Sequence, residues 1–190
     1  MRNRHSPRSR TLPSRWLFTD ERLGGEHPAD PLWRAIAALP RGAGIIFRHH
    51  SLAPAARRAL ALAIVAQARR RHLLVVLAEG PAGVRADGRH HSRRTRQRKA
   101  KAGLLTASAH SRREMVAAFR LGADLVFLSP VFATASHPGG QTLGPLRFGL
   151  LARGAAKPIV ALGGMSEKSG KRLRSLGASG FAAIDYWASL

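Results

Sequence analysis

The hydrophobic positions of this chain fall into short blocks separated by longer amphipathic stretches. From Arg15 onward, apolar runs of about five residues recur without internal alternation. Such continuous runs are typical of parallel strands that are covered on both faces. They predict seven strands, at residues 15–19, 44–48, 73–77, 104–108, 124–128, 158–162 and 180–184.

The first two intervening stretches predict helices at residues 31–39 and 54–71. Asp30 precedes the first of them and is expected to cap it, with Pro31 at the first helical position. The second carries an apolar stripe at three- and four-residue spacing, which predicts the face that packs on the core. That stripe consists of Ala59, Leu62, Ala63 and Ala66.

Two later stretches have clear helix ends. Ser111 is followed three residues later by Glu114, which predicts a capping box at the start of a helix over residues 111–121. Ser166 is expected to cap a helix over residues 166–176, and Gly177 is a typical C-terminal stop. Strand and helix thus alternate along the chain, which predicts βαβ units and a parallel sheet.

The number of strands decides between two architectures. Five or six βα units would form an open doubly wound sheet, whereas eight would close into a barrel. A weak eighth strand is placed at residues 84–90. Because the chain has 190 residues and such barrels typically have about 250, a barrel here requires short or missing helices, the last one a stub.

The alternating strands and helices are expected to form one domain, residues 15–190. The basic start of the chain lacks apolar periodicity, so residues 1–14 are predicted to be a disordered tail. The Arg- and Ser-rich tail also resembles an organellar presequence, although Pro7 and Pro13 interrupt any amphipathic helix. The absence of cysteine excludes a disulfide scaffold, a thiolate nucleophile and sulfur-ligated zinc. No apolar run approaches the ~20 residues needed to span a bilayer, so we expect a soluble, cytoplasmic protein.

The net charge of +22 arises from 32 Lys and Arg against 10 Asp and Glu. A balance this basic is typical of nucleic-acid binders, but it can equally follow from an Arg-rich composition. The net charge alone does not decide between nucleic-acid binding and an Arg-rich composition.

Several motifs carry a resemblance to a known family. Residues 121–140 read LGADLVFLSPVFATASHPGG, and KPIVALGGM and LGASGFAAI follow in the same order. Together with WLFTD, IIFR and TASAHS upstream, this order resembles the thiamine-phosphate synthase and TenI (thiazole tautomerase) family. The resemblance covers nearly all of residues 15–185 and implies a compact (β/α)8 TIM barrel. It also implies a role in thiamine biosynthesis or salvage at the thiazole-phosphate step.

The Gly163–Gly164 turn is a candidate phosphate site on its own chemistry. Its backbone N–H groups are unshielded by any Cβ and lie just before the helix that Ser166 caps. Alternatively, two glycines simply permit a tight strand-to-helix connection. The resemblance implies that Gly164 and Ile184 contact the substrate phosphate. It further implies substrate-binding positions at Arg48, Ser108, Thr134, Ser136 and His137.

The departures from the family pattern concern magnesium and pyrophosphate. Leu77 and Ala78 stand where the family has an Asn-Asp pair, and Thr95 stands near a second magnesium-ligating Asp. Magnesium is therefore expected for the family, but its ligands are largely absent here. Glu79 is one place beyond the lost Asp and is a candidate substitute. Weak or absent synthase activity is the resulting expectation.

Two further positions near the end of strands also differ. Ile46 and His50 stand where the family has Gln and Lys on either side of the shared Arg48. Asp185 replaces a Ser or Thr beside the phosphate, and we interpret it as the N-cap of the terminal stub. Acidic groups expected near the carboxyl ends of the strands are Asp20, Glu79, Asp87 and Asp185.

His110 is the candidate catalytic residue. The resemblance places it at the acid/base histidine of the tautomerases, and the synthases often carry a histidine there too. A proton shuttle needs a group that titrates near neutral pH and needs no metal. The alternative is a loop histidine bonded to the backbone.

The basic segment at residues 93–101, RRTRQRKAK, supports a second class of function. It is either a solvated surface or a contact for nucleic acid or another anionic surface, and without aromatic residues any such binding would be non-specific. His90 and His91 beside it lack carboxylate or cysteine partners, so no metal site is expected there. A non-catalytic barrel with basic segments is thus the alternative, and the oligomeric state is left open.

Overall fold

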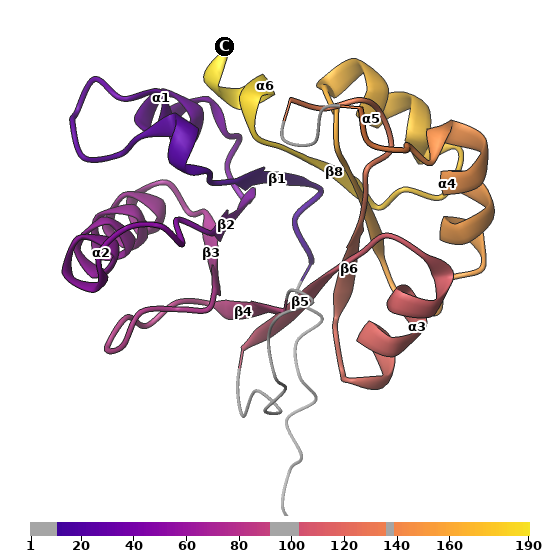
Figure 1. Ribbon diagram of the computed structural model, residues 1–190, viewed down its shortest axis with the longest axis horizontal. Helices are drawn as coiled ribbons and strands as arrows, with labels where there is room; N and C mark the ends of the chain where they lie inside the picture. The colour runs from indigo at the N-terminus through magenta and orange to yellow at the C-terminus, as the bar shows by residue number, and fades with distance from the viewer. Residues whose placement is uncertain (1–10, 92–102, 136–138) are drawn as a thin grey trace, which may run out of the picture.

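Eight parallel strands form a closed barrel in the computed structural model, which describes residues 11–91, 103–135 and 139–190 (Figure 1). Each strand pairs with its neighbours in chain order, and the barrel closes where β1 pairs with β8. The compact (β/α)8 architecture is therefore confirmed, including the weakly signalled fourth strand. The strands are β1 Arg15–Phe18, β2 Gly44–Phe47, β3 Leu74–Ala78, β4 Gly88–His91, β5 Leu104–Ala109, β6 Leu125–Leu128, β7 Ile159–Leu162 and β8 Gly180–Ala183.

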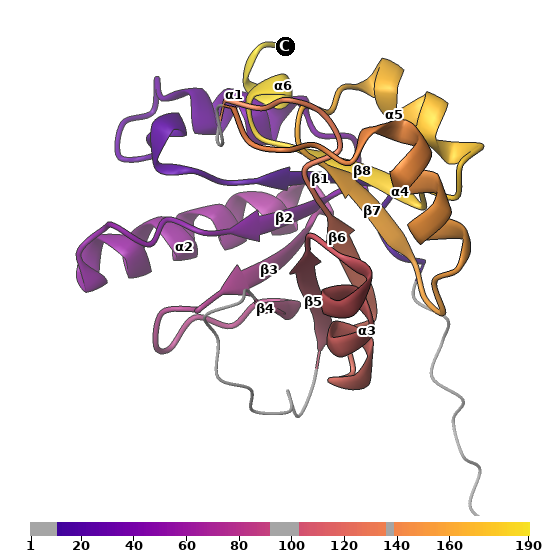
Figure 2. The same ribbon diagram turned by 45° about the vertical axis from the view of Figure 1, so that its right-hand side comes forward.

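The helices lie outside the barrel and are short (Figures 1 and 2). After a 3-10 turn at Glu21–Leu23, they are α1 Pro31–Ala38, α2 Pro54–Arg70, α3 Arg112–Arg120, α4 Gly144–Arg153, α5 Glu167–Arg174 and α6 Asp185–Ala188. Residues 79–87 connect β3 to β4 through turns without a helix. The terminal helix has four residues, so the expected stub is present. No helix within the described ranges is long and apolar enough to cross a membrane.

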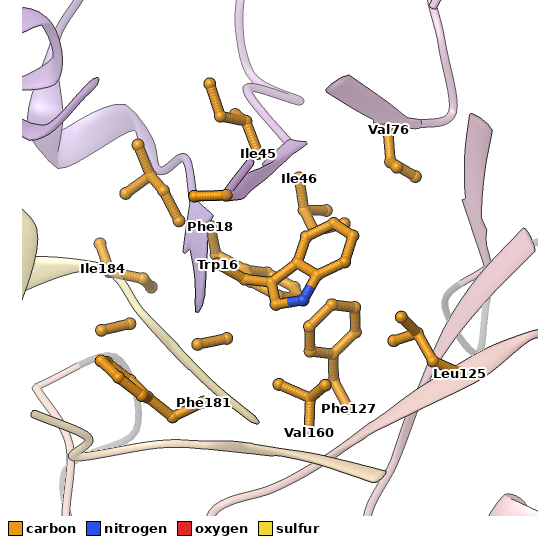
Figure 3. Close-up of a cluster of buried hydrophobic side chains, with 14 of the residues drawn as sticks. Trp16, Phe18, Ile45, Ile46, Val76, Leu125, Phe127, Val160, Phe181 and Ile184 are labelled. Atoms are coloured by element: carbon orange, nitrogen blue, oxygen red, sulfur yellow. The ribbon is translucent and has the colours of Figure 1, made fainter. Parts of the chain in front are cut away.

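Aromatic side chains fill the barrel interior. Phe127 meets Trp16 and Phe18 edge-on, with ring centroids 5.3 and 4.7 Å apart, and all three are at most 1% exposed (Figure 3). Gly44 lies opposite Trp16 on the neighbouring strand, and a Cβ at this position would lie 2.2 Å from the Trp16 ring. The bulk of Trp16 therefore requires glycine in β2.

The C-terminal helix fastens the closure between the first and last strands. Trp187 in α6 stacks on Phe181 of β8, and its indole N–H donates a hydrogen bond of 2.9 Å to the Trp16 carbonyl of β1. The two ends of the described barrel are thus joined both by the strand ladder and by a buried side chain.

The predicted packing face of α2 is wrong. The stripe that contains Ala59 and Leu62 is exposed, and Leu62 is 40% exposed. The helix buries Leu60, Ala61, Ile64, Val65 and Ala68 instead. Apolar residues surround this Ala-rich helix, so spacing alone does not identify the core face; the face with the β-branched side chains buries more area.

Two of the four predicted N-cap side chains form their cap hydrogen bond and two do not. The Ser111 and Ser166 hydroxyls accept hydrogen bonds from the Glu114 and Ser169 N–H groups of α3 and α5. The Glu114 carboxylate accepts from the His110 N–H. Asp30 occupies the predicted N-cap position of α1, but its carboxylate makes no cap hydrogen bond and instead closes the preceding turn, accepting from the N–H groups of Gly25 and His27.

Asp185 is the second predicted cap that forms no cap hydrogen bond. It is the first residue of α6, after an N-cap at Ile184, and its carboxylate lies 3.3 Å from the Arg22 guanidinium. The attraction of a nearby cation has thus directed this carboxylate away from the helix end.

Candidate functional site

A cavity of about 930 Å³ opens at the carboxyl ends of the strands. Seven of the nine predicted site residues line it, although they come from five different strand ends. They are Arg48, Ser108, His110, Thr134, Gly163, Gly164 and Ile184. Ser136 and His137 lie outside the described residues. The fold thus brings most of the predicted site together, and the roles of these residues remain predictions.

The Gly163–Gly164 turn forms one wall of the cavity. Both residues have positive φ, +95° and +62°, which favours glycine. A Cβ on Gly164 would lie 2.3 Å from the Ala133 carbonyl oxygen, because the loop after β6 packs on this turn. A backbone hydrogen bond of 3.1 Å from Phe132 to Gly163 joins the two loops. The turn is therefore fixed in shape.

Two backbone N–H groups at this end have no protein acceptor. Within the described ranges, the structure gives no hydrogen-bond partner to the N–H of Gly164 or of Ile184. Both residues line the cavity, and α5 begins three residues after Gly164. Free N–H groups beside the positive end of a helix are suited to binding a phosphate.

The hydrogen bonds of His110 determine which of its ring nitrogens is basic. Nδ1 lies 2.8 Å from the Ser129 carbonyl oxygen, which can only accept, so the neutral ring carries its proton on Nδ1. Nε2 then holds the lone pair, on a ring that lines the cavity. His110 therefore has both predicted features: a bond to the backbone and a nitrogen able to take up a proton.

Arg48 is the one Lys or Arg among the described residues that line the cavity. Its guanidinium lies 5.3 Å from the centre of the Phe18 ring and 3.2 Å from an Asp20 carboxylate oxygen. Burial lowers the pKa of Arg48, while the charge of Asp20 opposes that shift. Asp20 also binds Arg22, which in turn pairs with Asp185. The Asp185 carboxylate, which lines the same cavity as the Gly163–Gly164 turn, is thus directed toward a cation.

His90 is a site residue that the sequence pattern did not identify. It points into the barrel from β4, 3% exposed, with Nδ1 2.8 Å from the Thr106 hydroxyl and Nε2 3.0 Å from the Ser108 hydroxyl. Burial lowers its pKa to about 3, so the ring is neutral at physiological pH. Gly88 and His90 are buried and Arg89 is exposed, but the sequence Gly-Arg-His-His does not show this alternation.

The residues present do not fit a magnesium ion. Leu77 and Ala78 are the last two residues of β3, both are buried, and neither has an oxygen in its side chain. Magnesium binding needs one or two carboxylates with free coordination positions. All ten acidic residues lie in the described ranges, and there no three His, Asp or Glu residues group as a metal site. Thr95 lies outside those ranges.

The candidate carboxylates near the strand ends have other partners. Asp20 is held by two arginines, and Glu79 lies 3.8 Å from the His50 ring, with no group of three metal-ligating side chains among the described residues. Asp87 was expected at the carboxyl ends of the strands, and this is wrong. It precedes β4 at the amino-terminal end of the barrel, where it accepts a hydrogen bond from the Val75 N–H.

A guanidinium ties together the strand ends where the family pattern has its metal ligands. Arg57 of α2 donates to the carbonyl oxygens of His49, Ala78 and Glu79, at 2.5 to 2.7 Å. The ends of β2 and β3 are thereby fixed by a side chain that bears a permanent positive charge. The basic segment at residues 93–101 lies outside the described residues, and nucleic-acid binding stays a prediction.

Comparison with known proteins identifies the relatives of this chain. A family model described as thiamine monophosphate synthase matches residues 17–186. A thiamine-phosphate synthase of Methanosarcina barkeri is 34% identical over 82 residues, which is 43% of this chain and 37% of that protein. A putative thiamine-phosphate synthase of Aquifex aeolicus is 38% identical over 77 residues, 40% of this chain and 41% of that protein. The chain thus aligns with about two fifths of the length of these curated relatives.

Solved structures agree on the fold. A thiamine phosphate pyrophosphorylase from Pyrococcus furiosus superposes with a TM-score of 0.76 at 22% identity, over 92% of this chain and 86% of that one. The N-acetylmannosamine-6-phosphate 2-epimerase of Clostridium perfringens gives 0.61 at 14% identity, over 98% and 93%. At these identities the likeness concerns the barrel alone. The family follows from the sequence model, which spans almost the whole barrel: the chain belongs to the thiamine monophosphate synthase family.

Proposed function

We propose that this chain binds a thiazole phosphate in the cavity and that His110 moves a proton on the bound ring without a metal ion. The observation that carries the proposal is the convergence of seven predicted residues on one cavity. Family membership supports the substrate class, and the chemistry of the lining residues supports the reaction type.

The phosphate is assigned to the Gly163–Gly164 turn. The free N–H groups of Gly164 and Ile184 can donate to phosphate oxygens, and the adjacent α5 N-terminus favours the negative charge. Thr134 lines the same part of the cavity, and Arg48 adds the one guanidinium. A phosphate held here places the rest of the ligand toward Ser108 and His110.

His110 provides the acid/base group. Its Nε2 lone pair can take a proton from one position of the ring, and the resulting imidazolium can return it to another. The reaction conserves atoms and electrons and needs no oxidant or co-substrate. Ser129 stabilises the imidazolium, because its carbonyl oxygen accepts from the Nδ1–H in both protonation states.

Magnesium-dependent synthase chemistry is not part of the proposal. Departure of pyrophosphate calls for a divalent cation, and the buried Leu77 and Ala78 offer it no ligand. Arg48 remains from the family's pyrophosphate set, but Ile46 and His50 replace the Gln and Lys on either side of it.

Calorimetry tests the binding step. Wild-type protein is titrated with a thiazole phosphate and, separately, with inorganic phosphate; both should bind, the thiazole phosphate more tightly. Arg48→Met retains the contact with Phe18 but removes the charge, so affinity should fall about tenfold. Arg70→Met, at the exposed end of α2, makes the same change of charge far from the cavity and should leave affinity unchanged.

Turnover is measured by NMR as the interconversion of thiazole phosphate tautomers. Binding with turnover supports the whole proposal. Binding without turnover would overturn the catalytic part and leave a ligand-binding protein. No binding by the wild-type protein would overturn the proposal entirely.

A further inference from the structure

A buried histidine connects two hydroxyl groups beneath the cavity. His90 of β4 lies between Thr106 and Ser108 of β5, with one ring nitrogen within 3.0 Å of each hydroxyl oxygen. Thr106 is fully buried, whereas Ser108 is partly exposed and lines the cavity. The imidazole thus joins the closed interior of the barrel to its open end.

A neutral imidazole has one donor and one acceptor nitrogen, so two arrangements of the hydrogens exist. In the first, Nδ1–H donates to Thr106 and the Ser108 hydroxyl donates to Nε2. In the second, the Thr106 hydroxyl donates to Nδ1 and Nε2–H donates to Ser108. The two differ in which hydroxyl hydrogen is left without an acceptor.

Burial discriminates between them. Within the described ranges, the Thr106 hydroxyl has no hydrogen-bond partner other than His90, and solvent does not reach it. The first arrangement would leave the Thr106 hydrogen unpaired in the core, which is costly. In the second, the unpaired hydrogen is that of Ser108, which can bond to water or to a ligand.

We infer that His90 is a positioning residue: it holds its proton on Nε2, donates to Ser108, and so directs the Ser108 hydrogen into the cavity. Ser108 then meets the ligand as a donor, suited to a phosphate oxygen or a ring nitrogen lone pair. The hydrogen-bond arrangement itself does not depend on the proposed function; the ligand class does.

The surroundings of His90 keep the ring neutral and in place. Phe18 meets it edge-on at 5.5 Å and Phe127 lies 5.7 Å away, so two aromatic rings fix the plane of the imidazole. Burial, the charge of Arg48 and the nearby His91 and His50 all lower its pKa. A second proton, which would convert Nδ1 from acceptor to donor, is therefore strongly disfavoured.

Nitrogen-15 NMR of the ligand-free protein at pH 7 tests the arrangement directly. His90 should show the neutral Nε2–H tautomer and His110 the opposite Nδ1–H tautomer, which makes each the control for the other in one spectrum. Spectra of His90→Gln and His110→Asn assign the signals. A Nδ1–H tautomer or an imidazolium at His90 would overturn the inference, whether or not any ligand binds.

Affinity for thiazole phosphate tests the consequence. Ser108→Ala and His90→Leu should each weaken binding about tenfold, and the double variant should be no weaker than either. His90→Gln, whose amide can still donate to Ser108, should recover most of the affinity. A purely structural role predicts otherwise: His90→Leu would weaken binding further in the Ser108→Ala background, and Gln would not restore it.

If the wild-type protein binds no thiazole phosphate, the proposed function fails but the tautomer of His90 still decides this inference. If His90→Leu does not fold, the comparison of His90→Gln with Ser108→Ala takes its place. Equal affinity losses in these two would then contradict the positioning role.

Discussion

The two sides of the barrel rim have different chemistry. On the side of β5 to β8, strand ends carry hydroxyls, His110 and the Gly163–Gly164 turn, all facing one cavity. On the side of β2 to β4, β3 ends in Leu77 and Ala78, and Arg57 ties the neighbouring carbonyls together. Within one barrel, the side of β5 to β8 therefore has groups suited to holding a phosphate, whereas the side of β2 to β4 has, among the described residues, no ligands for a metal ion at the end of β3.

The largest expected effect concerns His110, the proposed acid/base residue on the β5 side. His110→Asn keeps a donor for the Ser129 carbonyl but has no basic nitrogen, so tautomerisation should slow by roughly 10²- to 10⁴-fold while affinity changes less than about threefold. NMR turnover assays measure the first and calorimetry the second. His72→Asn, in the turn before β3, is the control and should behave as wild type. An unchanged tautomerisation rate in His110→Asn would show that His110 is not the acid/base residue.

The next effect concerns the glycine turn. Gly164→Asp adds a Cβ close to the Ala133 carbonyl oxygen and a negative charge where the phosphate is assigned, so affinity should fall by at least about 100-fold. Gly154→Asp makes the same change at the end of α4, where a Cβ meets nothing closer than 3.8 Å, and should bind normally. Circular dichroism confirms folding of both, and Gly164→Ala replaces the Asp variant if it unfolds. Retained affinity at position 164 would place the phosphate elsewhere.

Acid should destabilise the protein through the histidine buried on the β4 side. Because the folded pKa of His90 is about 3 and its ordinary value is 6.5, the unfolded chain binds the proton more readily between these values. Stability is therefore complete above about pH 6.5 and declines as pH falls, by about 1.4 kcal/mol per pH unit from this group. Urea unfolding at pH 7 and pH 5 measures the decline. His90→Gln should lose roughly 2 kcal/mol less than wild type over this interval; equal losses would contradict the assignment.

The smallest expected effect is that of magnesium. With aliphatic side chains at the end of β3 and no cluster of three metal-ligating side chains among the described residues, affinity for thiazole phosphate should change less than about twofold between magnesium and a chelator. Titrations under the two conditions measure this. The same protein and the same ligand are compared in both titrations. A tenfold difference in affinity between magnesium and chelator would therefore show that the β2–β4 side retains a metal site.

The sequence predicted the strands well because each is a continuous apolar run buried on both faces. It predicted the cavity-lining residues through motif order, since residues at the carboxyl ends of parallel strands meet at one rim. The α2 face and the cap hydrogen bonds of Asp30 and Asp185 were wrong for a common reason. In each case the position was decided by a partner distant in sequence or by packing, neither of which local spacing encodes.

His90 shows a different limit. The sequence places it at the end of a weak predicted strand, where a metal ligand is the only role considered for it, whereas the register of β4 turns it inward. Its partners Thr106 and Ser108 belong to the neighbouring strand, so their contact depends on a pairing that one sequence does not specify. The sequence Gly-Arg-His-His at residues 88–91 shows no alternation of apolar and polar residues, so it gave no local signal for the inward side.

The closure of β1 onto β8 has a consequence for the order in which the protein can fold during synthesis. The partner strand of β1 begins at Gly180, and the indole that locks the pair belongs to Trp187. Until these residues have been translated, β1 has one unpaired edge and a Trp16 carbonyl without its donor. A nascent chain can therefore build strand pairs in sequence, but it can complete the barrel, and with it the cavity, only when β8 and Trp187 have emerged.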